Sequence, residues 1–244
     1  MLLTSLDNER VKNYVKLKER KYREKMGLFL VEGMHLVLEA YKKGMIEELI
    51  LEQDEVLPLN VPTVYVTNEI IHRISTLETP SNVMALCRKK EPEPLGKRVL
   101  LLDEIQDPGN LGTILRSAAA FDIDTVVLGT HTVDLYNPKV IRATQGMFFH
   151  INVITQDLKE VISLLKAQEI PVYGTRVEFG EDVRHLQSKD KEAFGLVMGN
   201  EGNGVKAEIM DLCDAYLYIE INDNVESLNV AVATSIILYE LNRR

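Results

Sequence analysis

The stretch LVMGNEGNGV (196–205) is the clearest candidate for binding a ligand through backbone groups. Three glycines and two asparagines surround a single carboxylate, Glu201, directly after an apolar run. Each glycine costs conformational entropy on folding, and a plain strand-to-helix turn needs only one. The order GxxGxG differs from the dinucleotide fingerprint GxGxxG, and the Gly-Lys-Ser/Thr ending of a P-loop is missing. We therefore expect close approach of the loop to a ligand, and the pattern disfavours an ordinary dehydrogenase or NTPase.

A second stretch, DEIQDPGNLGTILRSAAAF (103–121), places polar side chains beside a predicted helix. Asp107 to Asn110 predict a turn, and the helix is predicted from Leu111 onward. Arg116 would lie in the first exposed turns of this otherwise apolar helix. A capped helix with one surface charge explains the same pattern, so this stretch alone does not decide between a site and a plain turn.

The third stretch is VESLNVAVATSIILYELNRR (225–244), which ends the chain. Residues 230–241 predict a buried amphipathic helix, yet Ser227 and Asn229 stand at its entrance. Ser227 as an N-cap, its hydroxyl accepting a free backbone N–H, is the simplest interpretation. The alternative is that the polar entrance of the helix forms part of a binding site.

A regular alternation of apolar runs and helical patterns must position these three stretches. The expected strands are RVLLLDEI (98–105), DTVVLG (124–129), HINVI (150–154), IPVYGT (170–175), AFGLVMGN (193–200) and AYLYIEI (215–221). Such an α/β rhythm predicts a mainly parallel sheet covered by helices on both faces. Ligands bind such sheets outside the carboxyl ends of the strands, so the three stretches are expected to converge on one site.

The chain before this sheet predicts a separate, smaller domain. A basic helix near residues 8–24 is followed by mixed strand and helix patterns, which indicate a small α/β domain over residues 1–90. The charged, proline-bearing residues 91–98 are expected to form a linker. Residues 99–244 then make up the larger domain.

The charge is unevenly distributed. The formal net charge is −9, but residues 1–98 hold 16 Lys/Arg against 15 Asp/Glu, while residues 99–244 hold 12 against 22. The segment RVKNYVKLKERKYREK (10–25) contains eight basic residues and two tyrosines. A solvated helix face is one interpretation, and a surface for the phosphate backbone of a nucleic acid is the other.

Cysteine, histidine and hydropathy patterns exclude several classes of protein. Cys87 and Cys213 lie far apart without metal-ligand spacing, and the five histidines form no HxxxH or HxH pattern, so no metal site is predicted. No apolar run approaches the roughly 18–20 residues that cross a bilayer, and no signal-peptide pattern begins the chain. We expect a cytoplasmic protein without a membrane partner.

The order of the polar stretches resembles the three motifs of the SpoU (TrmH-type) RNA 2′-O-ribose methyltransferases of the SPOUT superfamily. The matching patterns are N-x-G-x-I-x-R-[ST]-A from Asn110, [LI]-V-x-G-[NAS]-E-G-x-G from Leu196, and I-x-x-x-x-x-V-x-S-L-N-V-[AS]-x-A from Ile219. NPKVIRATQG (137–146) is similar to the family's Arg-Ala-Ser-x-Gly segment. GLFLVEGMHLVLEA (27–40) resembles the small ribosomal-protein-like RNA-binding domain of many members.

The resemblance implies a fold, a cofactor and a set of site residues. The larger domain would carry a deep trefoil knot at its C-terminal end, bind S-adenosyl-L-methionine, and form a homodimer. The implied cofactor-binding residues are Thr175, Met198, Gly199, Ile219 and Leu228. The implied catalytic residues are Asn110, Arg116, Glu201, Ser227 and Asn229. One departure is Glu220, which stands where the family usually has proline and could loosen the strand end.

The implied reaction is transfer of a methyl group from S-adenosylmethionine to a ribose 2′-hydroxyl in RNA, with rRNA favoured over tRNA. RNA would bind through segment 10–25 and the Arg116 site. We interpret Arg116 as gripping a phosphate and stabilising developing negative charge, because a guanidinium rarely deprotonates. The group that takes the hydroxyl proton stays open. The alternative is a non-catalytic RNA-binding or ribosome-assembly factor with the same fold.

Overall fold

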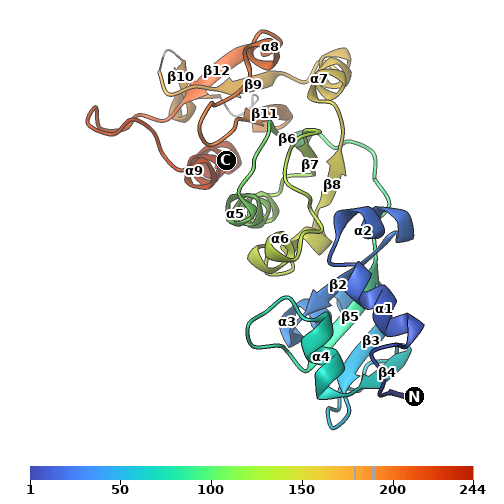
Figure 1. Ribbon diagram of the computed structural model, residues 1–244. Helices are drawn as coiled ribbons and strands as arrows, with labels where there is room; N and C mark the ends of the chain where they lie inside the picture. Colours follow the sequence, from blue (N-terminus) through green and yellow to red (C-terminus); the bar gives the residue numbers. More distant parts are fainter. Residues whose placement is uncertain (179, 188–190, 244) are drawn as a thin grey trace. The chain divides into compact units, whose positions relative to one another are not determined.

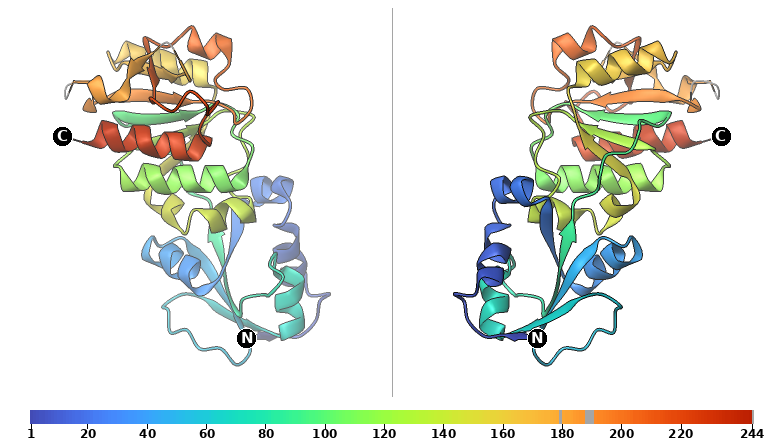
Figure 2. Two further views of the ribbon diagram at one scale, coloured as in Figure 1. Left: turned by 90° about the vertical axis from the view of Figure 1, so that its left-hand side faces the viewer. Right: turned by 90° about the vertical axis from the view of Figure 1, so that its right-hand side faces the viewer.

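The computed structural model describes residues 1–178, 180–187 and 191–243 (Figure 1). Among these residues no helix has the length and apolar character needed to cross a bilayer. Both parts of the chain are α/β, and each has a β-sheet with helices packed on it (Figures 1 and 2).

The chain forms two compact units whose boundaries differ from the prediction in one respect. The first unit contains Met1–Glu91 together with Asp134–Phe149, and the second contains Pro92–Val133 and His150–Arg244. The break at Glu91 lies at the start of the expected linker. The segment Asp134–Phe149, which we had placed in the larger domain, packs with the first unit instead. Its aromatic side chains explain this, because the rings of Tyr136 and Phe148 lie 4.7 and 6.0 Å from that of Phe29.

The first unit is a five-stranded sheet with helices on both faces (Figure 2). Its strands lie in the order β1 (Leu2–Leu3), β4 (Thr63–Val66), β3 (Ile46–Glu52), β5 (Val83–Arg88) and β2 (Leu28–Glu32). Its helices are α1 (Glu9–Lys16), α2 (Arg20–Met26), α3 (Met34–Lys42), α4 (Asn68–Ile74) and α6 (Pro138–Ala143). Helices α1 and α4 share one hydrophobic core with the sheet, and α3 covers the other face.

The basic segment 10–25 forms two helices, not one, and much of its charge is used inside the unit. Arg10 and the hydroxyl of Tyr14 both donate to the carboxylate of Glu48, which is 8% exposed. Arg23 is 4% exposed and donates to the carbonyl oxygens of Leu17 and Lys18, each at 2.8 Å, in the break between α1 and α2. Several of the basic side chains that suggested a nucleic-acid surface therefore hold helices in place.

The second unit is a seven-stranded sheet in which every pairing between the described strands is parallel, as predicted. The order is β10 (Glu181–Asp182), β12 (Ala215–Tyr218), β9 (Val172–Thr175), β11 (Phe194–Met198), β6 (Arg98–Leu102), β7 (Thr125–Leu128) and β8 (Asn152–Thr155). The central strands β11, β6 and β7 are buried throughout or nearly so, which explains their continuous apolar runs.

Helices cover both faces of this sheet (Figure 2). Helices α7 (Leu158–Ala167) and α8 (Ala207–Met210) lie on one face, and α5 (Pro108–Ala120) and α9 (Val230–Asn242) lie side by side on the other. The hydroxyls of Ser117 and Ser235 meet at 2.6 Å between α5 and α9. The C-terminal knot that the family resemblance implies stays a prediction.

The start of α5 and the strand β5 both differ from the sequence-based prediction. Helix α5 begins at Pro108, not at Leu111, because Asp107 caps it by accepting the Asn110 N–H at 2.8 Å. Asn110 therefore lies in the first helical turn. Strand β5 was not predicted, because its run VMALCR is poor in β-branched and aromatic residues. It pairs with β2 and β3 and so lies inside the sheet.

Candidate active site at the carboxyl ends of the parallel strands

A cavity of about 780 Å³ opens at the carboxyl ends of three adjacent strands of the second unit. Its lining begins at their last residues, Thr175 of β9, Met198 of β11 and Tyr218 of β12. The glycine loop 199–204 and residues 226–228 before α9 also line the cavity. The volume lies in the range of small-molecule and cofactor sites. Two of the three polar stretches thus converge at one cavity.

The glycine loop lines the cavity, and two of its glycines are needed for the loop's own closure. Asn200 and Gly204 exchange two backbone hydrogen bonds, of 2.9 and 3.0 Å. A Cβ on Gly199 would lie 2.0 Å from the carbonyl carbon of Gly204, so no side chain fits there. Gly204 itself has φ +67°, which favours glycine. At Gly202 the nearest atom to a Cβ would be 3.7 Å away, which is ordinary contact.

Glu201 connects this loop to the start of α5. Its carboxylate accepts the backbone N–H groups of Gln106 at 3.2 Å and Asp107 at 3.1 Å, and the side-chain amide of Asn110 at 3.0 Å. A carboxylate at a helix N-terminus also meets the positive end of the helix dipole. Burial opposes the charged form, but the bonds from Asn110 and these backbone groups outweigh it and lower the pKa of Glu201. The carboxylate is therefore a fixed anion at neutral pH and unsuited to donate a proton.

The hydrogen bonds continue from Glu201 to the entrance of α9. Asn229 donates its side-chain amide to the carbonyl oxygen of the Asn110 side chain at 3.0 Å. The Asn229 side-chain oxygen accepts the N–H groups of Ala231 at 2.9 Å and Val232 at 3.3 Å. A carboxylate can only accept and helix N–H groups can only donate, so both amides between them must point the same way. We call this chain, Glu201–Asn110–Asn229, the amide relay.

The relay corrects the interpretation of Ser227. Asn229, not Ser227, is the N-cap of α9. Ser227 is exposed, lines the cavity and forms no hydrogen bond with any residue that the structure describes. Its hydroxyl is therefore available to a ligand.

The five residues expected at the cofactor all line the cavity: Thr175, Met198, Gly199, Ile219 and Leu228. Thr175 donates its hydroxyl to the Val197 carbonyl at 2.9 Å, which joins the ends of β9 and β11. Met198 is 3% exposed, and Ile219 and Leu228 are partly buried. Their contribution to the wall is mainly apolar.

Arg116 lies apart from the other candidate residues. Its side chain is exposed on α5, does not line the cavity, and forms no ion pair or hydrogen bond within the described part of the chain. The structure thus brings together seven of the ten residues at the cavity and adds Asn110 and Asn229 through the relay. Arg116 is left as a free cation at the surface.

Glu220 does not place its charge in the cavity. Ile219 and Ile221 line the cavity on either side of it, while the Glu220 carboxylate pairs with Arg184. Arg184 also binds Asp182 and lowers the pKa of that carboxyl to about 2. The strand end that lacks the usual proline is thus connected to β10 by an ion pair.

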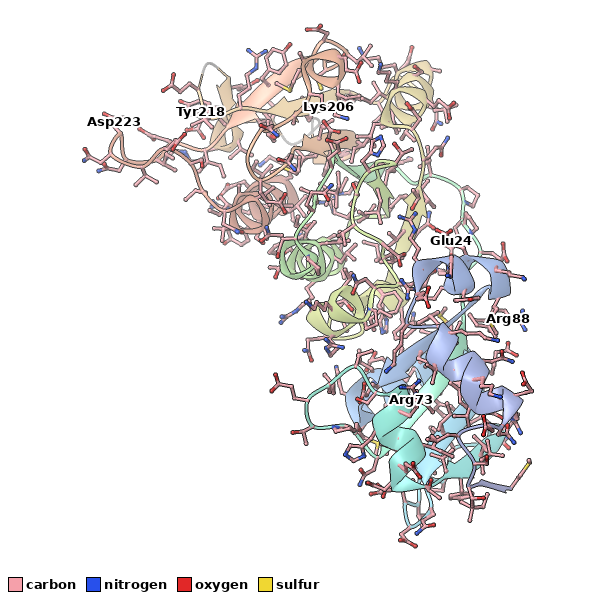
Figure 3. The ribbon with its side chains drawn as sticks, in the orientation of Figure 1. Glu24, Arg73, Arg88, Lys206, Tyr218 and Asp223 are labelled. Atoms are coloured by element: carbon pink, nitrogen blue, oxygen red, sulfur yellow. The ribbon has the colours of Figure 1, made fainter. Side chains whose placement is uncertain are left out.

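Two residues that hold the loops together were not predicted from the sequence. Asn200 donates to the Glu104 carbonyl at 2.8 Å and accepts from the backbone N–H of Gly202 at 3.0 Å. Lys206, at the start of α8, binds Glu104 through its amine at 2.6 Å and Asp103 through its backbone N–H at 2.9 Å. Figure 3 labels Lys206, Tyr218 and Asp223, which mark the α8 side, the β12 end and the outer loop of this region. Asn200 lies inside the GNEGNG pattern, where its amide was a recognisable signal.

Fold and site together define a class. A parallel α/β sheet with a cofactor-sized cavity at its strand ends, a glycine loop in the wall and a polar relay beside it is the arrangement of a nucleotide-type cofactor enzyme. Within the described residues no three His, Cys, Asp or Glu side chains gather as a metal site would need.

Comparisons with known proteins identify the family. Residues 97–239 match the model of the SpoU rRNA Methylase family, and residues 8–85 match that of the MRM3-like substrate binding domain. The chain is 38% identical over 245 residues to 23S rRNA (guanosine(2553)-2′-O)-methyltransferase RlmP of Bacillus subtilis, covering 98% of each protein. The protein belongs to the SpoU rRNA methylase family.

Solved structures agree with this assignment over the whole chain. A TrmH-family protein from Porphyromonas gingivalis superposes with a TM-score of 0.87 at 35% identity, covering 97% of this chain and 98% of the other. The AdoMet-bound rRNA methyltransferase from Sinorhizobium meliloti gives a TM-score of 0.87 at 29% identity, covering 99% and 97%. The resemblance inferred from three motifs is confirmed.

Proposed function

We propose that this protein is an S-adenosylmethionine-dependent methyltransferase that modifies a ribose 2′-hydroxyl of 23S rRNA. The observation that carries the proposal is that two of the family motifs line one cavity and that the relay joins Asn110 of the remaining motif to them. Similarity over 98% of the chain to a 23S rRNA 2′-O-methyltransferase supports the substrate class. The same similarity favours catalysis over the alternative of a non-catalytic RNA-binding or assembly factor.

The cavity suits the cofactor. Its aliphatic wall of Met198, Ile219 and Leu228 matches an apolar ring system, and the exposed Ser227 hydroxyl offers a polar contact. The closed backbone of loop 199–204 leaves peptide groups, not side chains, at the wall next to Gly199. When bound, S-adenosylmethionine supplies an electrophilic methyl group with a good leaving group. These residues would hold it.

The chain's own contribution to the reaction is positioning and charge stabilisation. A ribose hydroxyl is a weak nucleophile, so in-line placement and stabilisation of its developing negative charge lower the barrier. Arg116 is free to bind an RNA phosphate bidentately and to place its positive charge near that oxygen. Asn110 acts through its bonds to Glu201 and Asn229 and is a positioning residue, whereas Glu201 and Ser227 both line the cavity.

We assign RNA binding to the first unit together with Arg116. The match to a substrate binding domain over residues 8–85 supports this assignment. Of the basic segment 10–25, Lys21 and Lys25 stay exposed, whereas Arg10 and Arg23 are engaged internally. Because rRNA is assembled into ribosomes in the cytoplasm, we place the enzyme there.

We further propose that two copies associate through α9. This helix exposes Val232 and Tyr239 with 47% and 51% of their surface accessible, seven residues apart and therefore on one face. Tyr239 also packs edge-on against Phe121, 5.9 Å between ring centres, which extends the apolar surface to α5. A second copy is the natural occupant of such a stripe. Sedimentation of the wild type as a dimer and of Val232→Asp as a monomer would test it.

The function is tested with unmodified 23S rRNA transcript and methyl-labelled cofactor. After nuclease digestion the label should appear in a 2′-O-methylnucleoside, and label in a base would contradict the proposal. Calorimetry separates the rival function, because a pure RNA-binding factor would not bind S-adenosylmethionine. Arg116→Ala should lose turnover while keeping its melting temperature, since the side chain has no partner in the described structure.

A further inference from the structure

Three cations of the first unit gather around the end of α4. Lys18 donates its amine to the carbonyl oxygens of Arg73 at 2.9 Å and Ser75 at 2.7 Å. Arg142, from α6, donates to the Thr76 hydroxyl at 2.9 Å. Residues 73–76 are thus contacted by Lys18, which follows α1, and by Arg142 of α6, and they include Arg73 of α4. Figure 3 labels Arg73 at the end of α4.

None of the three cations has an anionic side chain bound to it among the described residues. Lys18 and Arg142 donate to uncharged oxygens, and the Arg73 side chain, which is exposed, has no hydrogen bond or ion pair there. Burial and the positive charge of Arg73 lower the pKa of Lys18. Other cations of this unit differ: Arg10, Arg20 and Arg88 each pair with a glutamate.

The nearby carboxylate is engaged elsewhere. Glu32 accepts the Ser75 hydroxyl at 2.5 Å and the backbone N–H groups of Thr76 at 3.2 Å and Ser81 at 3.1 Å. It thereby shapes the loop that follows α4 and leaves a local excess of two positive charges. The hollow that Lys18, Thr76 and Arg142 share with Glu32 has a volume of only about 30 Å³, so an anion would bind at its rim.

We propose that Lys18, Arg73 and Arg142 form a contact surface for the phosphate backbone of the RNA substrate. On a chain of net charge −9, a polyanion needs such a local excess of cations. Of the basic segment 10–25, this surface uses only Lys18, because Arg10 and Arg23 bind groups within the unit. Because Arg142 belongs to α6, the proposal also gives a role in substrate binding to the segment NPKVIRATQG (137–146). The inference rests on the proposed function for the identity of the RNA.

The test compares two triple variants of the full chain. Lys18→Gln/Arg73→Gln/Arg142→Gln removes the three charges while keeping hydrogen-bond donors. Lys42→Gln/Lys43→Gln/Arg88→Gln removes three exposed charges elsewhere in the same unit, outside segment 10–25. Affinity for unmodified 23S rRNA transcript is measured by fluorescence anisotropy between roughly 50 and 200 mM salt. In a plot of log affinity against log salt concentration, each single-strand phosphate contact contributes roughly 0.7 to the steepness of the slope.

The surface variant should bind more weakly than the control, with a salt slope smaller by roughly 2 if all three cations meet phosphates. Equal affinities and slopes in the two variants would overturn the proposal. If the triple variant melts early, Arg73→Gln alone decides, because the Arg73 side chain holds no other group of the described structure; it should lower the slope by roughly 0.7. Cofactor affinity, measured separately by calorimetry, should be unchanged, so failure of the surface and failure of the methyltransferase proposal give different results.

Discussion

The helices of the first unit and the candidate site of the second unit are held by different kinds of polar contact. In the first unit, charged pairs such as Glu48 with Arg10 and Arg23 with Asp134 are drawn into the structure and hold helices on the sheet. In the second unit, the site is organised by one carboxylate and two neutral amides, while Arg116 stays free. A run of charged residues in the sequence can thus have a largely structural role, whereas two neutral asparagines can organise a site.

The largest expected effect comes from removing a buried ion pair of the first unit. Arg23→Ala removes two bonds to backbone carbonyls and the partner of Asp134 at 2.5 Å. Losing one member of a buried ion pair typically costs about 3–5 kcal/mol, and we expect that loss in the free energy of unfolding of the first unit. Urea unfolding measures it.

The matched control is Arg20→Ala on the same helix, whose pair with Glu24 is exposed. It should cost only about 0.3–0.5 kcal/mol. Cofactor affinity should be the same in both variants. A large fall in cofactor affinity for Arg23→Ala would contradict the purely structural role assigned to it.

The second prediction breaks the relay without breaking the helix. Asn229→Asp keeps an oxygen that caps α9 but replaces the amide that donates to Asn110 with a second acceptor. Displacement of reacting groups by about 1 Å can cost ~10²-fold in rate, and we expect a fall in turnover of that order with little change in melting temperature.

The control for the relay is Asn222→Asp, which makes the same charge change in the exposed loop before α9. The Asn222 side-chain oxygen accepts the Asn224 N–H at 2.9 Å, and aspartate preserves that bond. Turnover should be near wild type. Equal losses in the two variants would show that added negative charge, not the relay, matters.

A third comparison separates two glycines of the same loop. Gly199→Ala places a methyl group 2.0 Å from the Gly204 backbone, and Gly202→Ala meets nothing closer than 3.7 Å. Overpacking of this kind costs about 1–3 kcal/mol, so Gly199→Ala should weaken S-adenosylmethionine binding by about tenfold or more. Gly202→Ala should bind within about twofold of wild type by calorimetry. Tight binding by Gly199→Ala would show that the closed form of loop 199–204 is not needed to bind the cofactor.

The smallest effect concerns pH. Since the folded-state pKa of Glu201 is lowered, its contribution to stability is complete above the ordinary glutamate value of about 4.3 and is lost as pH falls through the folded value. Thermal stability of the second unit should therefore be flat near neutrality and decline only in acid. Glu201→Gln should make that acid decline shallower. An unchanged acid profile in this variant would indicate that other carboxylates control it.

Local patterns predicted most of the fold, and long-range contacts account for what was missed. Six of the seven described strands of the second unit were visible because buried parallel strands are continuous apolar runs, as in VLLL at 99–102, whereas β10 consists of Glu181 and Asp182 and has no such run. Packing of Asp134–Phe149 with the first unit depends on ring contacts to Phe29, more than 100 positions away, and no local pattern encodes them. Strand β5 was missed for the related reason that its two partners, not its residues, make it a strand.

The sequence predicted which residues belong to the site better than it predicted what each of them does. Motif order located the residues, but the direction of the relay follows only from the donors and acceptors at its two ends, which Glu201 and the α9 backbone supply. Ser227 and Asn229 stand two positions apart, and sequence alone could not tell which one caps the helix. The same holds for Arg10 of segment 10–25, because its partner Glu48 lies in a distant strand.

The most direct test of the account is steady-state transfer of labelled methyl groups to 23S rRNA transcript, with the RNA concentration varied. Arg116→Gln should lower kcat, with label still recovered only as 2′-O-methylnucleoside. The triple variant of Lys18, Arg73 and Arg142 should instead raise KM for RNA with kcat nearly unchanged. If no label reaches a ribose oxygen, or if the triple variant lowers kcat as Arg116→Gln does, the proposed division between a unit that binds RNA and a unit that methylates it is wrong.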